Sequence, residues 1–483
     1  MKLTTEQQEV VDTAKLPHVT LVKVQACAGA GKTATLIELS KQLEPKSGMY
    51  LAYNKAIATE AAGKFAGTPI ECRTIHSLAY GSTVRQYGLK VGFFKGRHIT
   101  ERLDPQSKAE VVDAIEEFML SANTDFEAYI RTTDLSPRLR ALASLYVNKM
   151  AQGLIECNHS FYLKYYHILL SNHTLQPPKT DLLMLDEFGD ITALTIEIFK
   201  LIQAKKKIAV GDVMQNIYSF TKTINGFKAL EGQGETVKLT RSFRCSEDVA
   251  FRIESFCREF LDDKFEFKGR PEVVLPANPT IALISRTNGG IIKSMMTLGS
   301  MGIPYNLTRP ASEIFGLVIT LLNLKQNPDI RRADMKFLIS DMRKYYAAPN
   351  LQRAYPTPLK YVMAVHSSDP QIKSGINVIL ELGPQMIYSL YNEAKAHEKV
   401  KVKHQYTITT SHSSKGLEYD MVEIQPDLDL SASKAIEDLK TCDITEEDRL
   451  QEELRLYYVA ASRAMYKVTG KLLEHYQGNS CQN

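Results

Sequence analysis

The chain has 483 residues, of which 44% are hydrophobic and 24% charged, and its formal net charge is +4. This length exceeds what one hydrophobic core supports and predicts two to four domains of a globular protein. The mild basic excess permits nucleic acid as a partner without requiring it. The longest apolar stretch, residues 314–324, is too short to span a bilayer, so we expect no membrane association. Seven cysteines without a Cys-x-x-Cys pair favour a reducing, cytosolic-type compartment.

The first predicted element is an amphipathic helix over residues 3–12, with Thr4 or Thr5 at its N-cap. Gln7 lies on this helix. A glutamine side chain offers a donor and an acceptor together, which suits the edge of an adenine ring. Glutamine on a helix is more often simply solvated, and that alternative stays open from the pattern alone.

The most informative stretch is residues 24–33, where an apolar strand leads into small residues that end in Gly-Lys-Thr and open a helix. Such a loop lets several backbone N–H groups face one anion at a helix N-terminus. Lys32 then reaches the β- and γ-phosphates of a nucleotide, and the Thr33 hydroxyl is placed to bind Mg²⁺. An accidental Gly-rich turn is the alternative. The loop residues expected to bind the nucleotide are Ala26, Cys27, Ala28, Gly29, Ala30 and Gly31.

Two further strands, residues 49–53 and 72–75, each lead into a helix, and this alternation predicts a parallel α/β sheet. Ligands of such sheets lie at the carboxyl ends of the strands. Asn54, Thr74 and His76 fall at strand ends and are candidate contacts, although helix capping or ordinary loop chemistry would explain each one singly.

In residues 80–178 the alternation of strands and helices stops, and this segment is predicted to be mostly helical. They contain a basic cluster around two aromatic residues, Phe93 and Phe94. Cations beside aromatic rings suit a nucleic-acid backbone plus base stacking, but a solvated charged face is at least as common. The basic residues are Arg85, Lys90, Lys95, Arg97 and Arg102.

A buried strand at residues 181–187 ends in two carboxylates. Asp186 can hold Mg²⁺, and Glu187 can polarise the water that attacks a phosphoryl group. Another core strand, residues 207–210, is followed by Gln215, which can sense a γ-phosphate. Tyr218 and Phe220 come next and can stack on bases, with core packing as the alternative.

A second unit is predicted from residue 239 onward. It contains strands at 281–288 and 406–410, a buried helix at 312–325 and a final helix at 452–464. Residues 327–402 carry no readable chemistry and are predicted to be helical.

Taken in order, these motifs resemble a compact superfamily 1 DNA helicase of the UvrD/Rep type. The resemblance spans residues 3 to 464. Its most specific parts are the Gln-x-Ile-Tyr run at 215–218 and the Ser-Lys-Gly-Leu-Glu run at 414–418. It also includes Ser-Phe-Arg at 242–244 and Val-Ala-Ala-Ser-Arg-Ala at 459–464.

The resemblance implies an α/β protein with two RecA-like cores, each carrying a mostly helical insertion, and with ATP and Mg²⁺ between the cores. The first core would be residues 1–78 and 180–238, with 79–179 inserted. The second would be 239–326 and 403–483, with a shortened insertion at 327–402. The implied activity is ATP-driven 3′→5′ translocation on single-stranded DNA with unwinding at single/double-strand junctions. The implied compartment is the cytoplasm of a bacterial or phage-infected cell, or the nucleus of a eukaryote.

The resemblance also assigns roles in the second core. Arg244 and Arg463 would reach the γ-phosphate, Phe243 would stack on adenine, and Glu418 would steady the ribose. The implied DNA contacts are Asn54, Thr74, His76, Tyr218, Phe220, Arg286, Asn288, Thr410 and His412.

The chain departs from the family at several positions. Gly189 stands where the family has Gln, Ala34 replaces an Arg, and Phe220 replaces a frequent Trp. Two other functions remain open: a translocase that strips proteins from DNA with little unwinding, and a P-loop NTPase switch that never touches nucleic acid.

Overall fold

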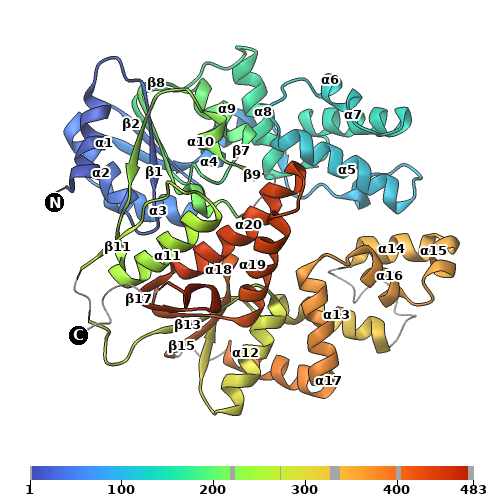
Figure 1. Cartoon of the computed structure of the whole chain (residues 1–483). Coiled ribbons are helices and arrows are strands. Elements are labelled where there is room, and N and C mark those ends of the chain that lie inside the picture. Colours follow the sequence, from blue (N-terminus) through green and yellow to red (C-terminus); the bar gives the residue numbers. More distant parts are fainter. Residues whose placement is uncertain (1–2, 218–222, 272–273, 327–337, 399–403, 477–483) are drawn as a thin grey trace. The chain divides into compact units, whose positions relative to one another are not determined.

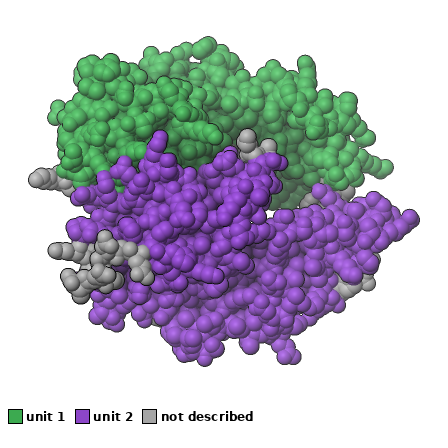
Figure 2. Space-filling view, viewed as in Figure 1, with its two compact units in different colours: residues 1–240 green, residues 241–483 purple. Residues whose placement is uncertain are grey.

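The computed structural model describes residues 3–217, 223–271, 274–326, 338–398 and 404–476 (Figure 1). The chain divides into two compact units, residues 1–240 and 241–483, which are coloured separately in Figure 2. In the described parts, every helix is too short or too polar to cross a bilayer.

Unit 1 is built on a six-stranded parallel sheet with the strand order β10-β1-β8-β6-β2-β3. Toward their carboxyl ends the central strands are almost wholly buried, as in sheets covered by helices on both faces. The strands are β1 (Leu21–Ala26), β2 (Gly48–Ala52), β3 (Ile70–Thr74), β6 (Lys179–Leu185), β8 (Gln203–Gly211) and β10 (Glu235–Leu239).

Helices connect these strands, as parallel strands require crossover connections. Asn54 caps α3 by accepting the Ile57 backbone N–H, and Thr74 caps α4 by accepting that of Ser77. The helices of the core are α1 (Thr5–Lys15), α2 (Lys32–Leu43), α3 (Lys55–Lys64), α4 (Ile75–Tyr80), α9 (Ala193–Leu201) and α10 (Gly226–Ala229).

The predicted helical insertion of unit 1 is present, and Figure 1 shows α5, α6 and α7 grouped to one side of the sheet. It shares one hydrophobic core with the sheet: Ile115 and Phe161 of the insertion belong to the same buried cluster as Leu51 and Leu183 of the strands. The insertion is therefore anchored to the core by apolar packing. Its elements are β4 (Lys90–Val91), α5 (Pro105–Leu120), α6 (Phe126–Arg131), α7 (Pro137–Ala151), β5 (Glu156–Cys157) and α8 (His159–Ser171).

Unit 2 has a five-stranded parallel sheet with the order β14-β15-β13-β16-β17. Its strands are β13 (Ile281–Ser285), β14 (Tyr305–Leu307), β15 (Tyr406–Thr410), β16 (Tyr419–Ile424) and β17 (Ala464–Thr469). Outside the sheet, β11 (Arg241–Ser246) pairs with β12 (Lys268–Arg270). The helices of this core are α11 (Glu247–Phe260), α12 (Asn288–Ser300), α18 (Ser411–Ser414), α19 (Pro426–Leu439) and α20 (Ile444–Ala461).

The second insertion is helical wherever the structure describes it. A buried cluster ties it to α13 and to the sheet, because Val378 and Leu390 pack with Ile408 and Phe315. Its helices are α14 (Ile339–Ala347), α15 (Pro349–Ala354), α16 (Pro358–Val365) and α17 (Pro370–His397), and α13 (Ala311–Gln326) precedes it in the chain. Two parallel α/β sheets with helical insertions confirm the predicted fold class. The finer domain limits stay a prediction.

Candidate active site

The predicted catalytic and nucleotide-binding residues of unit 1 follow three neighbouring strands and lie at one edge of the sheet. β1 runs into the phosphate loop, β6 into Asp186 and Glu187, and β8 into Asp212 and Gln215. β8 lies between the other two and pairs with both in parallel, so their carboxyl ends coincide. The loop and the acidic motif, about 150 residues apart in the chain, therefore meet.

The phosphate loop has the backbone that its glycines predict. Gly29 and Gly31 both have φ of 74°, a left-handed conformation that disfavours other side chains. Gly31 is the N-cap of α2, and no described side chain caps that helix. The N–H groups of the first turn thus keep the orientation of an anion site.

Lys32 forms an ion pair with Glu187, with 3.1 Å between Nζ and Oε1. Burial would lower the pKa of Lys32, but the carboxylates of Glu187, Asp186 and Asp212 outweigh it and raise that pKa above its ordinary value. The ammonium group is therefore charged throughout the neutral range, as a phosphate ligand must be.

Glu187 has a backbone φ of 55°, which is rare for a residue other than glycine and is strained. The strained turn directs Glu187 toward Lys32, while Asp186 points into the sheet and is 7% exposed. Burial raises the pKa of Asp186, and the Lys32 charge opposes this. The two neighbouring carboxylates thus occupy different environments and can do different work.

The loop after Glu187 packs directly on the end of β8, backbone against backbone. A Cβ at Gly189 would lie 2.3 Å from the Asp212 carbonyl oxygen, and one at Gly211 would lie 2.5 Å from the Gly189 nitrogen. The family's glutamine at position 189 would therefore clash with the backbone here. The departure seen in the sequence follows from this close approach.

The side-chain amides of Gln7 and Gln215 both form hydrogen bonds with nearby residues of unit 1. The Gln7 amide donates to Thr35 Oγ1 at 3.0 Å and accepts from the Thr4 backbone at 3.1 Å, in a capping box that starts α1. Gln215 donates to Asp212 Oδ2 at 2.6 Å. These contacts attach α1 to α2 and Gln215 to β8, and the nucleotide roles of both glutamines stay predictions.

Tyr50 of β2 was not singled out by the sequence, but its hydroxyl donates to Asp186 Oδ2 at 2.5 Å. Its side chain is fully buried and packs on Phe65, with 5.5 Å between ring centroids. Burial and the Asp186 charge raise the pKa of Tyr50, so the phenol stays protonated and fixes the direction of the carboxylate. A tyrosine among the apolar residues of a core strand is the only sequence signal for it.

We expect Tyr50→Phe to fold normally but to need about two- to tenfold more Mg²⁺ for half-maximal nucleotide binding, the effect of one lost hydrogen bond. The ring packing remains, so a thermal melt should change little. Mg²⁺-dependent binding of a fluorescent ADP analogue measures the shift. Tyr146→Phe is the matched control, because Tyr146 is a buried tyrosine that donates to Glu101 at 2.6 Å within the insertion. An equal Mg²⁺ requirement in Tyr50→Phe and wild type would contradict the assignment.

The four residues of unit 2 that were predicted to bind the nucleotide also come together. Arg244 Nε pairs with Glu418 at 2.9 Å, and its Nη1 donates to the Ser462 carbonyl at 3.3 Å. Arg463 is 1% exposed and donates to the Val459 carbonyl at 2.9 Å and the Ser462 hydroxyl at 2.9 Å. Phe243 is 46% exposed, so its ring is available for stacking.

The predicted DNA contacts have mixed surroundings. Asn54 and Thr74 each cap a helix, which is the structural role that the pattern left open, and Thr410 also caps one. Arg286 forms a bidentate pair with Glu453 at 2.6 and 2.7 Å, and the Asn288 amide bonds Arg309 and the Glu313 carbonyl. His412 follows Thr410 on α18, whereas Tyr218 and Phe220 lie outside the described residues. Their DNA roles stay predictions.

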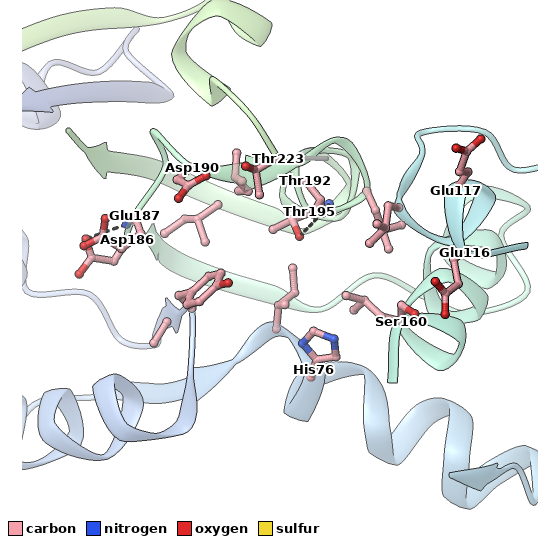
Figure 3. A pocket seen from close by; sticks show the side chains of 18 of the residues that line it. His76, Glu116, Glu117, Ser160, Asp186, Glu187, Asp190, Thr192, Thr195 and Thr223 are labelled. Atoms are coloured by element: carbon pink, nitrogen blue, oxygen red, sulfur yellow. Dashed lines mark hydrogen bonds between the residues drawn. The ribbon is translucent and has the colours of Figure 1, made fainter. Parts of the chain in front are cut away.

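His76 lines a pocket of about 800 Å³ in unit 1 (Figure 3). Asp186, Glu187 and Asp190 stand at one end of the pocket, and Glu116 and Glu117 of α5 at the other. Burial, and then the nearby His159, lower the pKa of His76, so its ring is neutral at pH 7. The residues that line this pocket include none of 26–33. It shares Asp186 and Glu187 with the carboxyl edge of the sheet, and its acidic walls do not suit a polyphosphate.

Comparison with known proteins agrees with this geometry. Residues 7–221 match the model of a family described as AAA domain, and residues 362–469 match that of the UvrD-like helicase C-terminal domain. F-box DNA helicase 1 of Gallus gallus is 24% identical in an alignment of 462 positions that covers 88% of this chain and 45% of that protein. F-box DNA helicase protein 1 of Schizosaccharomyces pombe is 23% identical in an alignment of 531 positions that covers 96% of this chain and 56% of that protein.

This chain thus spans about half the length of the curated relatives it matches. The two matched regions fall on the two units, each of which has its own parallel sheet in the manner of a RecA-like core. Phosphate loop, acidic strand end and arginine cluster occur in the order that the resemblance implied. In both units the chain is therefore similar to the UvrD-like superfamily 1 helicases.

Proposed function

We propose that this chain hydrolyses ATP to translocate 3′→5′ along single-stranded DNA and to unwind duplexes at single/double-strand junctions. The observation that carries the proposal is the meeting of the phosphate loop, Asp186 with Glu187, and Gln215 at the carboxyl ends of three adjacent strands. The similarity to these helicases supports DNA as the substrate.

The donors at this edge fit ATP with Mg²⁺. Mg²⁺ prefers hard oxygen ligands, and the Thr33 hydroxyl and the Asp186 carboxylate are of that kind. Asp186 Oδ1 accepts the Glu187 N–H at 2.8 Å and Oδ2 accepts the Tyr50 hydroxyl, which leaves each oxygen a further lone pair. When bound, Mg²⁺ would neutralise charge on the β- and γ-phosphates.

Side chains of the protein would bind the phosphates, orient the attacking water and stabilise the transition state. Lys32 exchanges its ion pair with Glu187 for the phosphates, and this exchange frees the Glu187 carboxylate to orient the attacking water. Arg244 and Arg463 would stabilise charge in the transition state from unit 2. Because they belong to the other unit, hydrolysis would depend on closure of the two cores.

Polarity rests on the Gln-x-Ile-Tyr-x-Phe run at 215–220, the kind that occurs in the 3′→5′ branch of the superfamily. If Tyr218 and Phe220 offer successive stacking positions, closure passes bases between them in one direction. Phosphate contacts alone would grip the strand without such a preference.

We expect single-stranded DNA to raise the ATPase rate strongly and a duplex with a 3′ tail to be unwound in preference to one with a 5′ tail. Steady-state ATPase assays and a strand-displacement assay with either tail measure these effects. An ATPase rate that ignores DNA would favour the NTPase switch. Stimulation without strand displacement would favour the protein-stripping translocase, and unwinding from the 5′ tail alone would refute the polarity.

A further inference from the structure

The insertion of unit 1 exposes an aromatic side chain that the proposed motor does not use. Phe93 lies between β4 and the short 3₁₀ helix Gly96–His98 and is 66% exposed, whereas the adjacent Phe94 is 2% exposed. Phe94 packs on Tyr146, with 5.4 Å between ring centroids. Packing in the core of the insertion therefore explains the aromatic residue at position 94. It does not explain the exposed phenylalanine at position 93.

The backbone around Phe93 is firmly held. β4 pairs with β5, and the Gly92 N–H donates to the Cys157 carbonyl at 2.9 Å. On the other side, the Phe94 N–H donates to Asn158 Oδ1 at 2.6 Å. Phe93 is thus presented on a fixed loop, and a partner that contacts it has less backbone entropy to overcome than on a loose loop.

Three cations share this loop with Phe93. Lys90, Lys95 and Arg97 are all exposed, and Lys95 Nζ lies 5.8 Å from the centroid of the Phe93 ring. The carboxylate beside them, Glu156, accepts the Phe93 N–H at 3.3 Å. The complementary occupant carries repeated negative charges and flat apolar rings, and a nucleic-acid single strand has both.

The loop is joined to the pocket that contains His76. Asn158, which bonds Phe94, also donates to Glu116 Oε1 at 3.2 Å, and Glu116 lines that pocket together with His76. The pocket wall formed by Asp113, Glu116 and Glu117 is acidic and repels phosphates, whereas the Phe93 loop is basic. A strand at the carboxyl edge of the sheet would therefore keep its backbone along the loop rather than inside the pocket.

We propose that the insertion forms an additional contact for single-stranded DNA, in which Phe93 stacks on a base and Lys90, Lys95 and Arg97 bind the flanking phosphates. The inference rests on the proposed function in that the substrate is DNA. The proposed contact is a binding site for the DNA strand that lies outside the helicase motifs.

The test compares Phe93→Ala with Phe93→Tyr, which keeps the stacking surface, and with Leu154→Ala. Leu154 is a control of matched exposure, a large apolar side chain of the same insertion that is 61% exposed. Anisotropy of a labelled oligo-dT gives the Kd. We expect a Kd about fivefold or more higher for Phe93→Ala, and a Kd close to wild type for the other two variants. The DNA-free ATPase rate should be unchanged in all of them.

The salt dependence of binding tests the cations separately. A Lys90→Gln/Lys95→Gln double variant should lower the slope of log K against log salt by about 1.4, since each phosphate contact on a single strand contributes about 0.7. An unchanged slope would remove these lysines from the contact.

Two outcomes would overturn the stacking role. Equal Kd values for Phe93→Ala and wild type would mean that Phe93 serves another partner, such as a protein. Equal losses in Phe93→Ala and Phe93→Tyr would make its role structural. Failure of the proposed function looks different, because the wild type itself would then neither bind oligo-dT nor respond to it in ATPase rate.

Discussion

Lys32→Ala should abolish ATP hydrolysis and weaken nucleotide binding by about 10- to 150-fold, the value of a charged hydrogen bond of about 1.5–3 kcal/mol. The change removes the cation that faces the phosphates. It also takes the Lys32 cation away from Glu187, Asp186 and Asp212, the carboxylates whose charges raise the pKa of Lys32. Those carboxylates would then repel the nucleotide, so the two effects act in the same direction.

Titration with a fluorescent ATP analogue and a phosphate-release assay measure both quantities. Lys41→Ala is the control, because Lys41 lies on the same helix, its side chain is 56% exposed and it pairs with Glu38 at 3.6 Å. Circular dichroism shows whether Lys32→Ala folds, since loss of the Lys32–Glu187 pair also removes a tie between α2 and the end of β6. Near-normal turnover in a folded Lys32→Ala would refute the assignment of the phosphate loop.

Glu187→Gln should bind ATP and single-stranded DNA while its turnover falls by about 10²- to 10⁴-fold, the range for loss of a general base. The amide cannot take a proton from water, whereas Asp186 and its hydrogen bond from Tyr50 remain. Nucleotide affinity should hold or increase, because Lys32 no longer has to leave a carboxylate to meet the phosphates.

Single-turnover hydrolysis and equilibrium binding of the same fluorescent analogue separate the two effects. Glu197→Gln provides the comparison, because Glu197 pairs with Lys200 at 2.8 Å on α9, away from the carboxyl edge of the sheet. If Glu187→Gln lost binding while its residual catalysis stayed high, Glu187 would be a structural residue that holds Lys32 in place.

The sequence was sufficient for the elements whose pattern is local. The buried strands that precede the phosphate loop and Asp186 are continuous apolar runs, and glycines mark the loop between β1 and α2. The other five strands of the first sheet and both helical insertions were predicted in this way. β10 of the first sheet and β14, β16 and β17 of the second were not predicted. β10 (Glu235–Leu239) is short and alternates at the sheet edge, and its pairing with β1 joins residues more than 200 positions apart.

Only the tertiary structure decided which side chains meet. The Lys32–Glu187 ion pair and the Tyr50–Asp186 hydrogen bond join residues 155 and 136 positions apart, and no local pattern encodes either contact. In the sequence, Gly189 is only a departure from the family's Gln, whereas the structure shows that a side chain there would meet the backbone of Asp212. The sequence by itself determined the buried strands that precede the motifs, the phosphate loop and the order of the motifs, because these depend on neighbours along the chain. The partners of each charged group were decided by strand order, because adjacency in a sheet is independent of distance along the chain.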